Sequence, residues 1–235
     1  MLPPMRIRQY SISSSPLEDP TVATLTWSVL DTPSKAADSK RHLGVASNYL
    51  SFVEPGDRVH VTVKPSRGAF HPPMEIENTP VIMICAGTGL APFRAFVQER
   101  AWQIGAGRKL APAYLFIGCA HPEKDVLYAD ELKKWQDDGV VKVFYAYSQA
   151  SEQSKGCRHV QDRVWEEKEE LKKAFDNGAM LYVCGSSMVG EGVASTIKKI
   201  YQDAAHNVGK PKSDEEVEDW FQGIKNDRYA SDVFA

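Results

Sequence analysis

The chain has 235 residues, of which 43% are hydrophobic and 25% are charged, and its formal net charge is −3. At about 150 residues per domain, this length predicts one large domain or two small ones, and the composition excludes a disordered chain. The 28 Lys and Arg residues are balanced by 31 Asp and Glu residues with no cationic stripe, so we expect no nucleic-acid partner.

Apolar runs and cysteine spacing exclude further classes. The longest purely apolar run, 81–86, is far shorter than the roughly 20 residues of a membrane span, and the first residues lack a secretory apolar core. We therefore expect a cytoplasmic protein without a membrane span. The four cysteines form no C-x-x-C pair, so we expect free thiols and no metal site.

Up to about Pro80 the chain consists of short β-rich segments broken by turn residues. Segments 21–30 and 57–65 are predicted as strands, the second because Val59, Val61 and Val63 alternate with polar residues. A polar stretch, 31–42, separates them. This pattern is typical of part of an antiparallel barrel or sandwich.

From Val81 onward, apolar strands alternate with amphipathic helices, which predicts a parallel, doubly wound α/β sheet. One long helix is expected over 160–175, because its apolar residues recur with a period of 3.6. A last helix should begin at Ser213, which forms a Ser-x-x-Glu capping box with Glu216. The predicted strands are 81–86, 113–118, 140–148 and 180–185, and the helices that follow them are 91–103, 128–136, 160–175 and 191–205.

The sequence Gly87-Thr88-Gly89 lies between the first of these strands and a helix that begins near Pro92. Glycines at such a turn let a pyrophosphate approach the backbone, and the helix N-terminus offers amide groups to it. A GTG alone is equally consistent with a plain strand-to-helix turn, and it matches neither the phosphate loop nor the full G-x-G-x-x-G fingerprint.

A second motif, Arg8-Gln9-Tyr10-Ser11, is followed some thirty residues later by Gly44-Val45-Ala46-Ser47. An Arg beside an aromatic ring and a hydroxyl can offset pyrophosphate charge, stack on a flat ring and hydrogen-bond to it. Together with GTGLAP, FIGCAHPEKDVLY, YVCG and DVFA in this order, these motifs resemble the ferredoxin–NADP reductase family. Within its diflavin branch, they are closest to the reductase half of self-sufficient cytochrome P-450 fusion enzymes.

The resemblance implies two domains and a set of FAD contacts. Residues 1–78 correspond to a partial FAD-binding β-barrel, and residues 79–235 to an NADP(H)-binding α/β domain whose C-terminal tail shields the flavin. Arg8 would face the FAD pyrophosphate, and Tyr10, beside Gln9, would stack on the isoalloxazine. Further contacts are implied for Thr26, Trp27 and Ser28 on the adenine side, and for Gly44, Val45, Ala46 and Ser47 at the FAD phosphates.

The resemblance also implies an NADPH site and a hydride-transfer site. Gly87, Thr88 and Gly89 would meet the NADPH phosphates. The family's 2′-phosphate positions fall at or near Ser148, Gln149, Lys155, Arg158 and His159. Ser11, Cys184 and Asp232 would surround the site of hydride transfer, and Phe234 would stack on the outer face of the flavin. From position alone, a buried strand-end thiol is the commoner role for Cys184, and a terminal apolar residue is the favoured interpretation of Phe234.

Four residues depart from the family pattern. Cys85-Ala86 replaces the Gly-Pro that usually precedes GTG, and Ala120 and Gln149 stand where two arginines are usual. Arg158 and Lys155 can compensate for the missing cations, so NADPH is favoured over NADH.

In the family, further barrel strands, a helical insert and an FMN domain precede the RxYS motif. We therefore expect the chain to be the C-terminal part of a longer reductase that passes electrons from NADPH through FAD and FMN to a cytochrome P-450 haem. Its expected partners are that FMN domain and a haem monooxygenase domain, within the same polypeptide.

Three alternatives remain open. Truncation can leave a nucleotide-binding module without FAD activity, and the reductases of sulfite reductase and nitric oxide synthase share the same motifs. A serine hydrolase is disfavoured, because Gly185-Ser186-Ser187-Met188-Val189 ends in Val where the G-x-S-x-G motif has Gly.

Overall fold

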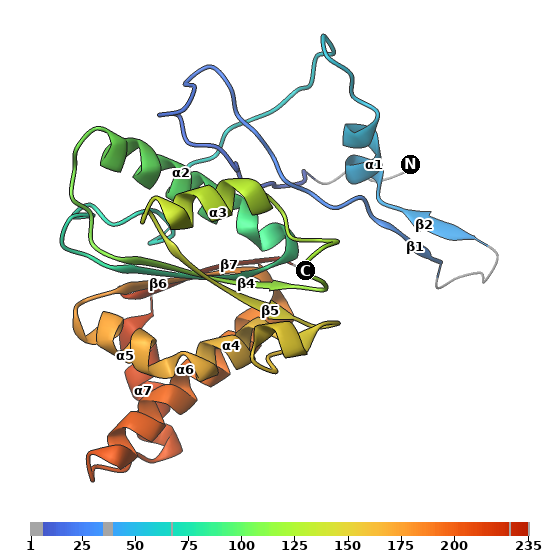
Figure 1. The fold of residues 1–235 in the computed structure, drawn as a ribbon. Coiled ribbons are helices and arrows are strands. Elements are labelled where there is room, and N and C mark those ends of the chain that lie inside the picture. The colour runs from blue at the N-terminus through green and yellow to red at the C-terminus, as the bar shows by residue number, and fades with distance from the viewer. Residues whose placement is uncertain (1–6, 35–39, 67, 226, 235) are drawn as a thin grey trace.

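The computed structural model describes residues 7–34, 40–66, 68–225 and 227–234. The ends of the two predicted domains, 1–6 and 235, lie outside these ranges, and so do 35–39, 67 and 226. The described part consists of an α/β body and, before it, a stretch with little regular structure (Figure 1).

A five-stranded sheet organises the α/β body. Its order is β5-β4-β3-β6-β7, and every neighbouring pair is parallel, which confirms the predicted fold class. The strands are β3 (Val81–Ala86), β4 (Ala113–Cys119), β5 (Lys142–Tyr147), β6 (Met180–Ser186) and β7 (Tyr229–Phe234).

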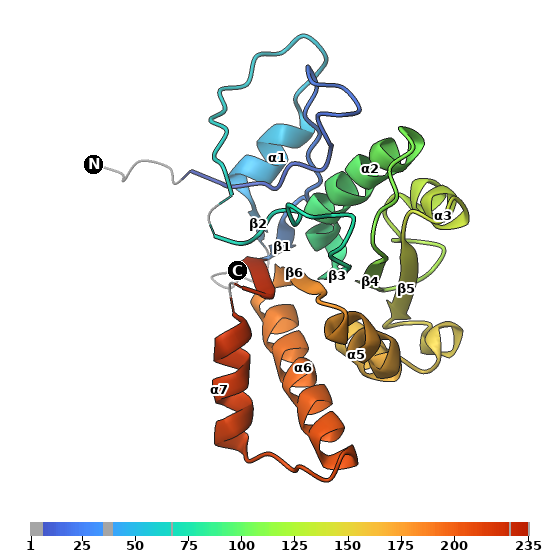
Figure 2. The same cartoon turned by 90° about the vertical axis from the view of Figure 1, so that its left-hand side faces the viewer.

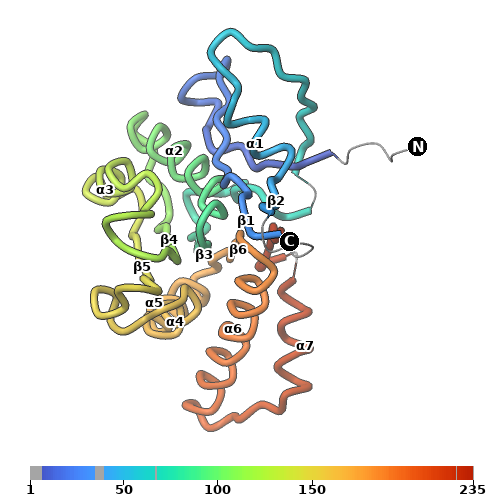
Figure 3. The backbone as a smooth tube through the Cα atoms, turned by 90° about the vertical axis from the view of Figure 1, so that its right-hand side faces the viewer, coloured from blue at the N-terminus to red at the C-terminus, as the bar shows by residue number. Residues whose placement is uncertain are grey.

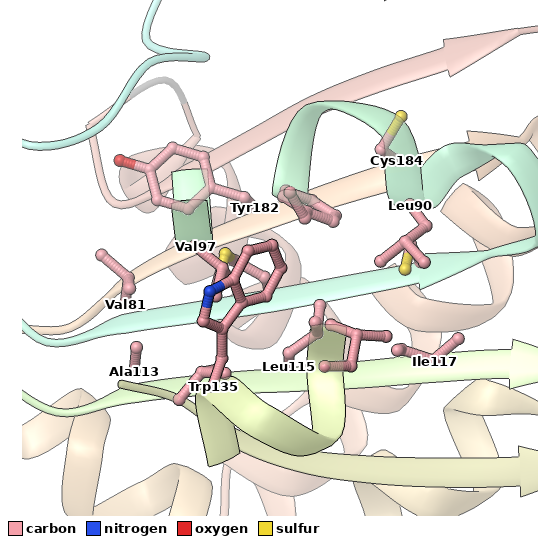
Figure 4. Packing of buried hydrophobic residues seen from close by; sticks show 14 of the residues in the cluster. Val81, Leu90, Val97, Ala113, Leu115, Ile117, Trp135, Tyr182 and Cys184 are labelled. Atoms are coloured by element: carbon pink, nitrogen blue, oxygen red, sulfur yellow. The ribbon is translucent and has the colours of Figure 1, made fainter. Parts of the chain in front are cut away.

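Both faces of this sheet are covered, because successive strand residues point to opposite sides. On one face, Met83 and Leu115 pack under α2 (Ala91–Gly105) and α3 (Ala129–Asp137). Figure 4 shows Trp135 of α3 among the buried side chains of this face, in the same cluster as Leu115 and Tyr182.

The opposite face of the sheet packs against α4 (Val160–Glu166), α5 (Lys168–Asp176), α6 (Ser187–Asn207) and α7 (Asp214–Ile224). In Figure 2, α6 and α7 lie side by side below the sheet.

Two helical predictions have different outcomes. The single helix expected over 160–175 is divided at Glu167, whose ψ of 22° departs from helical geometry. The helix expected at Ser213 is confirmed, because the Ser213 hydroxyl accepts from the Glu216 amide and the Glu216 carboxylate accepts from the Ser213 amide.

The region before the sheet contains one hairpin and one helix. Strands β1 (Asp31–Pro33) and β2 (Arg41–Leu43) pair antiparallel at the two ends of the polar stretch 31–42, where no strand was predicted, and α1 (Val45–Ser51) follows. The Arg41 guanidinium donates to both the carboxylate and the carbonyl of Asp31, which ties the hairpin together.

The two strands predicted in this region do not form as expected. Segment 21–30 has only an isolated bridge, between Leu25 and Ile12. Segment 57–65 forms no strand, and Val61 and Val63 are 76% and 75% exposed. Alternation alone does not make a strand, because the backbone groups also require a partner to pair with, and this segment finds none among the described residues.

Residues 7–30, here called the N-terminal segment, are docked on α2 by polar contacts (Figure 3). The Ser15 amide donates to Gln98 Oε1 at 2.8 Å, and the Trp102 indole donates to Glu18 at 2.7 Å. This face of α2 therefore positions the part of the chain that carries the RQYS motif.

Candidate functional site

The carboxyl ends of β3 and β6 form the topological switch point of the sheet, because β4 and β5 extend from β3 in one direction and β6 and β7 in the other. Ligands of open α/β sheets bind in the crevice at such a point. The GTG turn follows β3 and Gly185-Ser186 ends β6, so both lie at this edge.

The two glycines of the GTG turn differ in their surroundings. Gly87 adopts a positive φ of 55°, and a Cβ added there would meet nothing within 4 Å, so its backbone faces open space. A Cβ on Gly89 would lie 2.2 Å from the Cys184 carbonyl oxygen. Gly87 thus leaves room for a ligand, whereas Gly89 lets the turn pack against β6.

The three residues predicted at the hydride-transfer site come together from three distant segments. Cys184 of β6 is the register partner of Asp232 of β7, and the Ser11 hydroxyl donates to Asp232 Oδ2 at 3.3 Å. Burial raises the pKa of the Cys184 thiol to about 12, and the neighbouring Asp232 charge adds to this. Cys184 is therefore a neutral thiol at physiological pH.

The remaining residues of the RQYS motif are accessible. Arg8 and Gln9 are exposed, Tyr10 is half-buried, and the Arg8 guanidinium has no hydrogen-bond or ion-pair partner among the described residues. Its charge is free for a ligand.

The residues predicted on the adenine side of FAD differ in how their polar atoms are satisfied. The Thr26 hydroxyl lies 2.6 Å from the Tyr128 hydroxyl, and Ser28 is exposed. Trp27 Nε1 is buried without a hydrogen-bond partner in the described chain. A buried indole N–H normally has an acceptor, so this atom is a donor available to a bound group.

The predicted phosphate turn, Gly44 to Ser47, is stabilised from within. The Ser47 hydroxyl donates to the Gly44 carbonyl at 3.3 Å and accepts from the Leu30 amide at 3.0 Å. The Gly44 amide donates to the Leu30 carbonyl. The Val45, Ala46 and Ser47 amides, in the first turn of α1, have no acceptor among the described residues.

A cavity of about 180 Å³ opens at the carboxyl ends of β3, β4 and β5. Three predicted coenzyme residues line it, Ser148, Arg158 and His159, and they supply a hydroxyl, a guanidinium and an imidazole. The Asp162 carboxylate accepts from the Arg158 and His159 amides at 3.2 and 2.8 Å, which fixes this turn. The other lining residues are Ala86, Gly118, Cys119, Val160, Gln161 and Val189.

Two predicted coenzyme residues, Gln149 and Lys155, are not among those lining this cavity. The Gln149 amide donates to the Ala120 carbonyl, and the exposed Lys155 ammonium lies 2.7 Å from a Glu167 carboxylate oxygen. Lys155 thus already has a counter-charge.

Sequence reasoning missed Gln161 and Asp125. Gln161 lines the cavity, and the Asp125 carboxylate accepts from the Ala120 and His121 amides, both at 2.6 Å. The signal for Gln161 was its place just after His159 in the first turn of a helix at the ligand-binding edge.

Phe234, predicted to shield the flavin, ends β7 opposite Ser186 and is 43% exposed. The predicted tail is therefore part of the sheet, with an accessible ring at its end.

Within the described ranges, no helix is long and apolar enough to cross a membrane. All four cysteines are free thiols. Across these same residues, no three His, Cys, Asp or Glu side chains are placed to hold a metal ion.

Comparison with known proteins gives consistent matches. A family model described as an oxidoreductase NAD-binding domain matches residues 83–194. Bifunctional cytochrome P450/NADPH–P450 reductases of Acremonium egyptiacum and Fusarium oxysporum are 53% and 49% identical to this chain over its full length. A self-sufficient cytochrome P450 monooxygenase of Phanerodontia chrysosporium is 44% identical over the full length.

The chain spans 22% of the length of each of these three relatives. The ordered sequence motifs indicate a reductase of this kind. The similarity over the whole chain, the matching domain model and the parallel sheet all agree with that classification. The chain belongs to the ferredoxin–NADP reductase family.

Proposed function

We propose that this chain is the FAD- and NADPH-binding part of a flavoprotein oxidoreductase, which passes hydride from NADPH to FAD. The observation that carries this proposal is the meeting of Ser11, Cys184 and Asp232 at the carboxyl edge of the sheet, beside the GTG turn. A hydroxyl, a thiol and a carboxylate therefore lie close together at the edge where open α/β sheets bind their ligands.

The residues at this edge fit a phosphate-bearing coenzyme. Ser148, Arg158 and His159 supply hydrogen-bond donors to the cavity, and the open space at Gly87 lets a pyrophosphate approach the backbone. The guanidinium of Arg158 suits the doubly charged 2′-phosphate that distinguishes NADPH from NADH.

The N-terminal segment fits FAD. The Arg8 guanidinium has no partner in the described chain, and the Trp27 indole N–H is a buried donor without an acceptor. In the proposed arrangement Arg8 faces the pyrophosphate, the half-buried Tyr10 stacks on the isoalloxazine, and the Val45 and Ala46 amides hold the phosphates.

When bound, FAD supplies an acceptor for the hydride of NADPH. The chain's own groups orient the reactants and hold protons. The Ser11 hydroxyl holds its proton toward Asp232 Oδ2 and can turn it toward a flavin nitrogen, with the carboxylate as the alternative acceptor. Cys184 keeps its thiol proton, because burial raises its pKa to about 12, and it remains a neutral, buried group directly beneath this edge of the sheet.

We further propose that electrons leave FAD through an FMN domain to a cytochrome P-450 haem in the same polypeptide. The names of the similar proteins, which combine a cytochrome P450 with a P450 reductase, support this acceptor over those of sulfite reductase and nitric oxide synthase. A cytoplasmic location belongs to the same proposal, and imaging of the tagged full-length protein tests it.

A second candidate is a nucleotide-binding module without FAD activity. The lack of a strand over 57–65 favours it, because the FAD side of the structure then has few paired strands. The two candidates differ in whether the chain takes up FAD.

An anaerobic titration tests the proposal. The purified chain is incubated with FAD, desalted, and mixed with NADPH while its visible flavin spectrum is followed. We expect retained flavin that NADPH bleaches, and at least about tenfold slower bleaching in Ser11→Ala. Ser51→Ala, which removes an exposed serine hydroxyl of α1, serves as the control. If the chain retains no flavin but binds NADPH, the second candidate is correct.

A further inference from the structure

Arg94 is a buried cation at the start of α2, and its guanidinium donates hydrogen bonds to a carboxylate and to a backbone carbonyl. Its Nε and Nη2 donate to the two carboxylate oxygens of Glu131 on α3, at 2.7 and 2.9 Å. Its Nη1 donates to the Ser13 carbonyl at 2.7 Å. The Arg94 guanidinium therefore links α2 and α3, the helices on one face of the sheet, to the N-terminal segment.

Tyr128 extends this network to a second part of the N-terminal segment. Its ring lies 4.4 Å from the Arg94 guanidinium carbon, and its hydroxyl lies 2.6 Å from the Thr26 hydroxyl. Its φ of 56° is in the left-handed region, which is strained for a bulky residue. The surrounding contacts hold Tyr128 in a conformation that it would not adopt alone.

Ser13, the anchored residue, is two positions beyond Ser11. The Ser13 side chain is fully buried, its amide donates to the Thr24 carbonyl at 2.8 Å, and its hydroxyl lies 2.9 Å from the Thr24 hydroxyl. Two extended residues span only about 7 Å. The place of the Ser11 hydroxyl beside Asp232 therefore depends on where Ser13 is held.

We propose that Arg94 is a positioning residue for hydride transfer, which together with Tyr128 and Glu131 holds Ser11 and Thr26 in place relative to the sheet edge. Arg94 acts through Ser13 and does not touch the coenzyme cavity. The link to hydride transfer rests on the proposed function, whereas the anchoring of Ser13 concerns the chain itself.

Arg100 provides a matched comparison on the same helix. Arg94 and Arg100 are similarly buried, 9% and 7% exposed, but Arg100 donates to the Ala111 carbonyl and has no hydrogen bond or ion pair with the described N-terminal segment. Arg94→Met and Arg100→Met each remove a buried arginine from α2. Only Arg94→Met removes a hydrogen bond to the Ser13 carbonyl.

The first experiment measures amide hydrogen exchange in the full chain without added ligand. In Arg94→Met, the Ser13 and Ser15 amides should exchange about ten- to hundredfold faster, as expected for loss of a charged hydrogen bond. The Val81 amide, at the start of the central strand β3, donates to the Pro112 carbonyl and serves as the internal control. Its exchange rate should be the same in Arg94→Met and Arg100→Met. Equal exchange at Ser13 in the two variants would overturn the proposal.

The second experiment uses the FAD-loaded chain. Arg94→Met should slow flavin reduction at saturating NADPH about tenfold or more and leave the NADPH dissociation constant unchanged, because Arg94 does not line the cavity. Arg94→Lys, which keeps one cationic donor, should recover part of the rate. A changed dissociation constant with an unchanged rate would contradict a positioning role.

Tyr128→Phe keeps the test decisive if Arg94→Met does not fold, because it removes only the hydroxyl next to Thr26. Like Arg94→Met, Tyr128→Phe should accelerate amide exchange in the N-terminal segment and slow flavin reduction. If the parent chain takes up no FAD, the proposed function fails, while the exchange measurements still decide whether Arg94 anchors Ser13.

Discussion

Arg158 and Lys155 show how two nearby cations can differ in what they offer to a ligand. Arg158 lines the cavity at the carboxyl ends of β3, β4 and β5, and it has no ion-pair partner among the described residues. Lys155 is held by Glu167. Burial would raise the pKa of the Glu167 carboxyl, but the hydrogen bond from Lys155 and the charge of Arg163 lower it overall. The Lys155 charge is therefore already paired with that of Glu167, whereas the Arg158 charge is available to a ligand.

This difference predicts coenzyme selectivity. Arg158→Ala should weaken NADPH binding about ten- to hundredfold and NADH binding much less, because only NADPH carries the 2′-phosphate. Lys155→Ala should leave both affinities nearly unchanged. Calorimetric titration of both coenzymes measures these effects, and an equal loss for NADH and NADPH would show that Arg158 does not contact the 2′-phosphate.

The sequence predicts residues at strand ends better than it predicts contacts between segments. Ser148 was implied at the 2′-phosphate site by the family resemblance, and its place directly after a strand agrees with this, because parallel strands end at one edge of a sheet. The Arg94 contact with Ser13 could not be predicted, because no local pattern records which carbonyl a helical arginine will meet. The pairing of Lys155 with Glu167 was missed for the same reason.

At the scale of elements, the sheet core was predictable and the region before it was not. The apolar run of β3 is buried on both faces, so its hydrophobicity alone indicates a central strand. The alternation over 57–65 indicates a strand only if a neighbour pairs with it. The hairpin of β1 and β2 was missed because Asp31 and Arg41 lie in a stretch whose polarity suggests a linker.

The contact between the GTG turn and β6 predicts a sharp difference between two glycines. Gly89→Ala should lower the free energy of unfolding by about 1 to 3 kcal/mol, because its Cβ would lie 2.2 Å from the Cys184 carbonyl oxygen. It should also displace Cys184. Gly105→Ala, at the open end of α2, has nothing within 4 Å and should be neutral or slightly stabilising. Urea unfolding of both variants checks this, and equal stabilities would contradict the close approach.

At the scale of the whole molecule, several cysteine thiols and tyrosine hydroxyls have pKa values that burial raises above their ordinary values. Burial raises the pKa of the Cys119 and Cys184 thiols and of the Tyr229 hydroxyl, each to about 12. It also raises the pKa of Cys85 and Tyr182. These groups bind protons more tightly in the folded chain than in the unfolded chain.

Alkaline pH should therefore destabilise the protein. The contribution of these groups is fully present below about pH 9, where the unfolded thiols are protonated, and it is lost as the pH rises to about 12. Urea unfolding between pH 7 and pH 11 should show this decline, and Tyr229→Phe should make it shallower above about pH 10. A stability that stays constant to pH 11 would contradict the prediction.

The strand order β5-β4-β3-β6-β7 also constrains how the chain folds as it leaves the ribosome. Strands β3, β4 and β5 are complete once Tyr147 has been made, but β6 begins only at Met180 and β7 at Tyr229. At about 5 to 20 residues per second, one edge of β3 stays unpaired for seconds during synthesis. A nascent chain in this interval exposes an apolar strand edge that chaperones recognise, so slow codons placed just before β6 should lower the yield of folded protein.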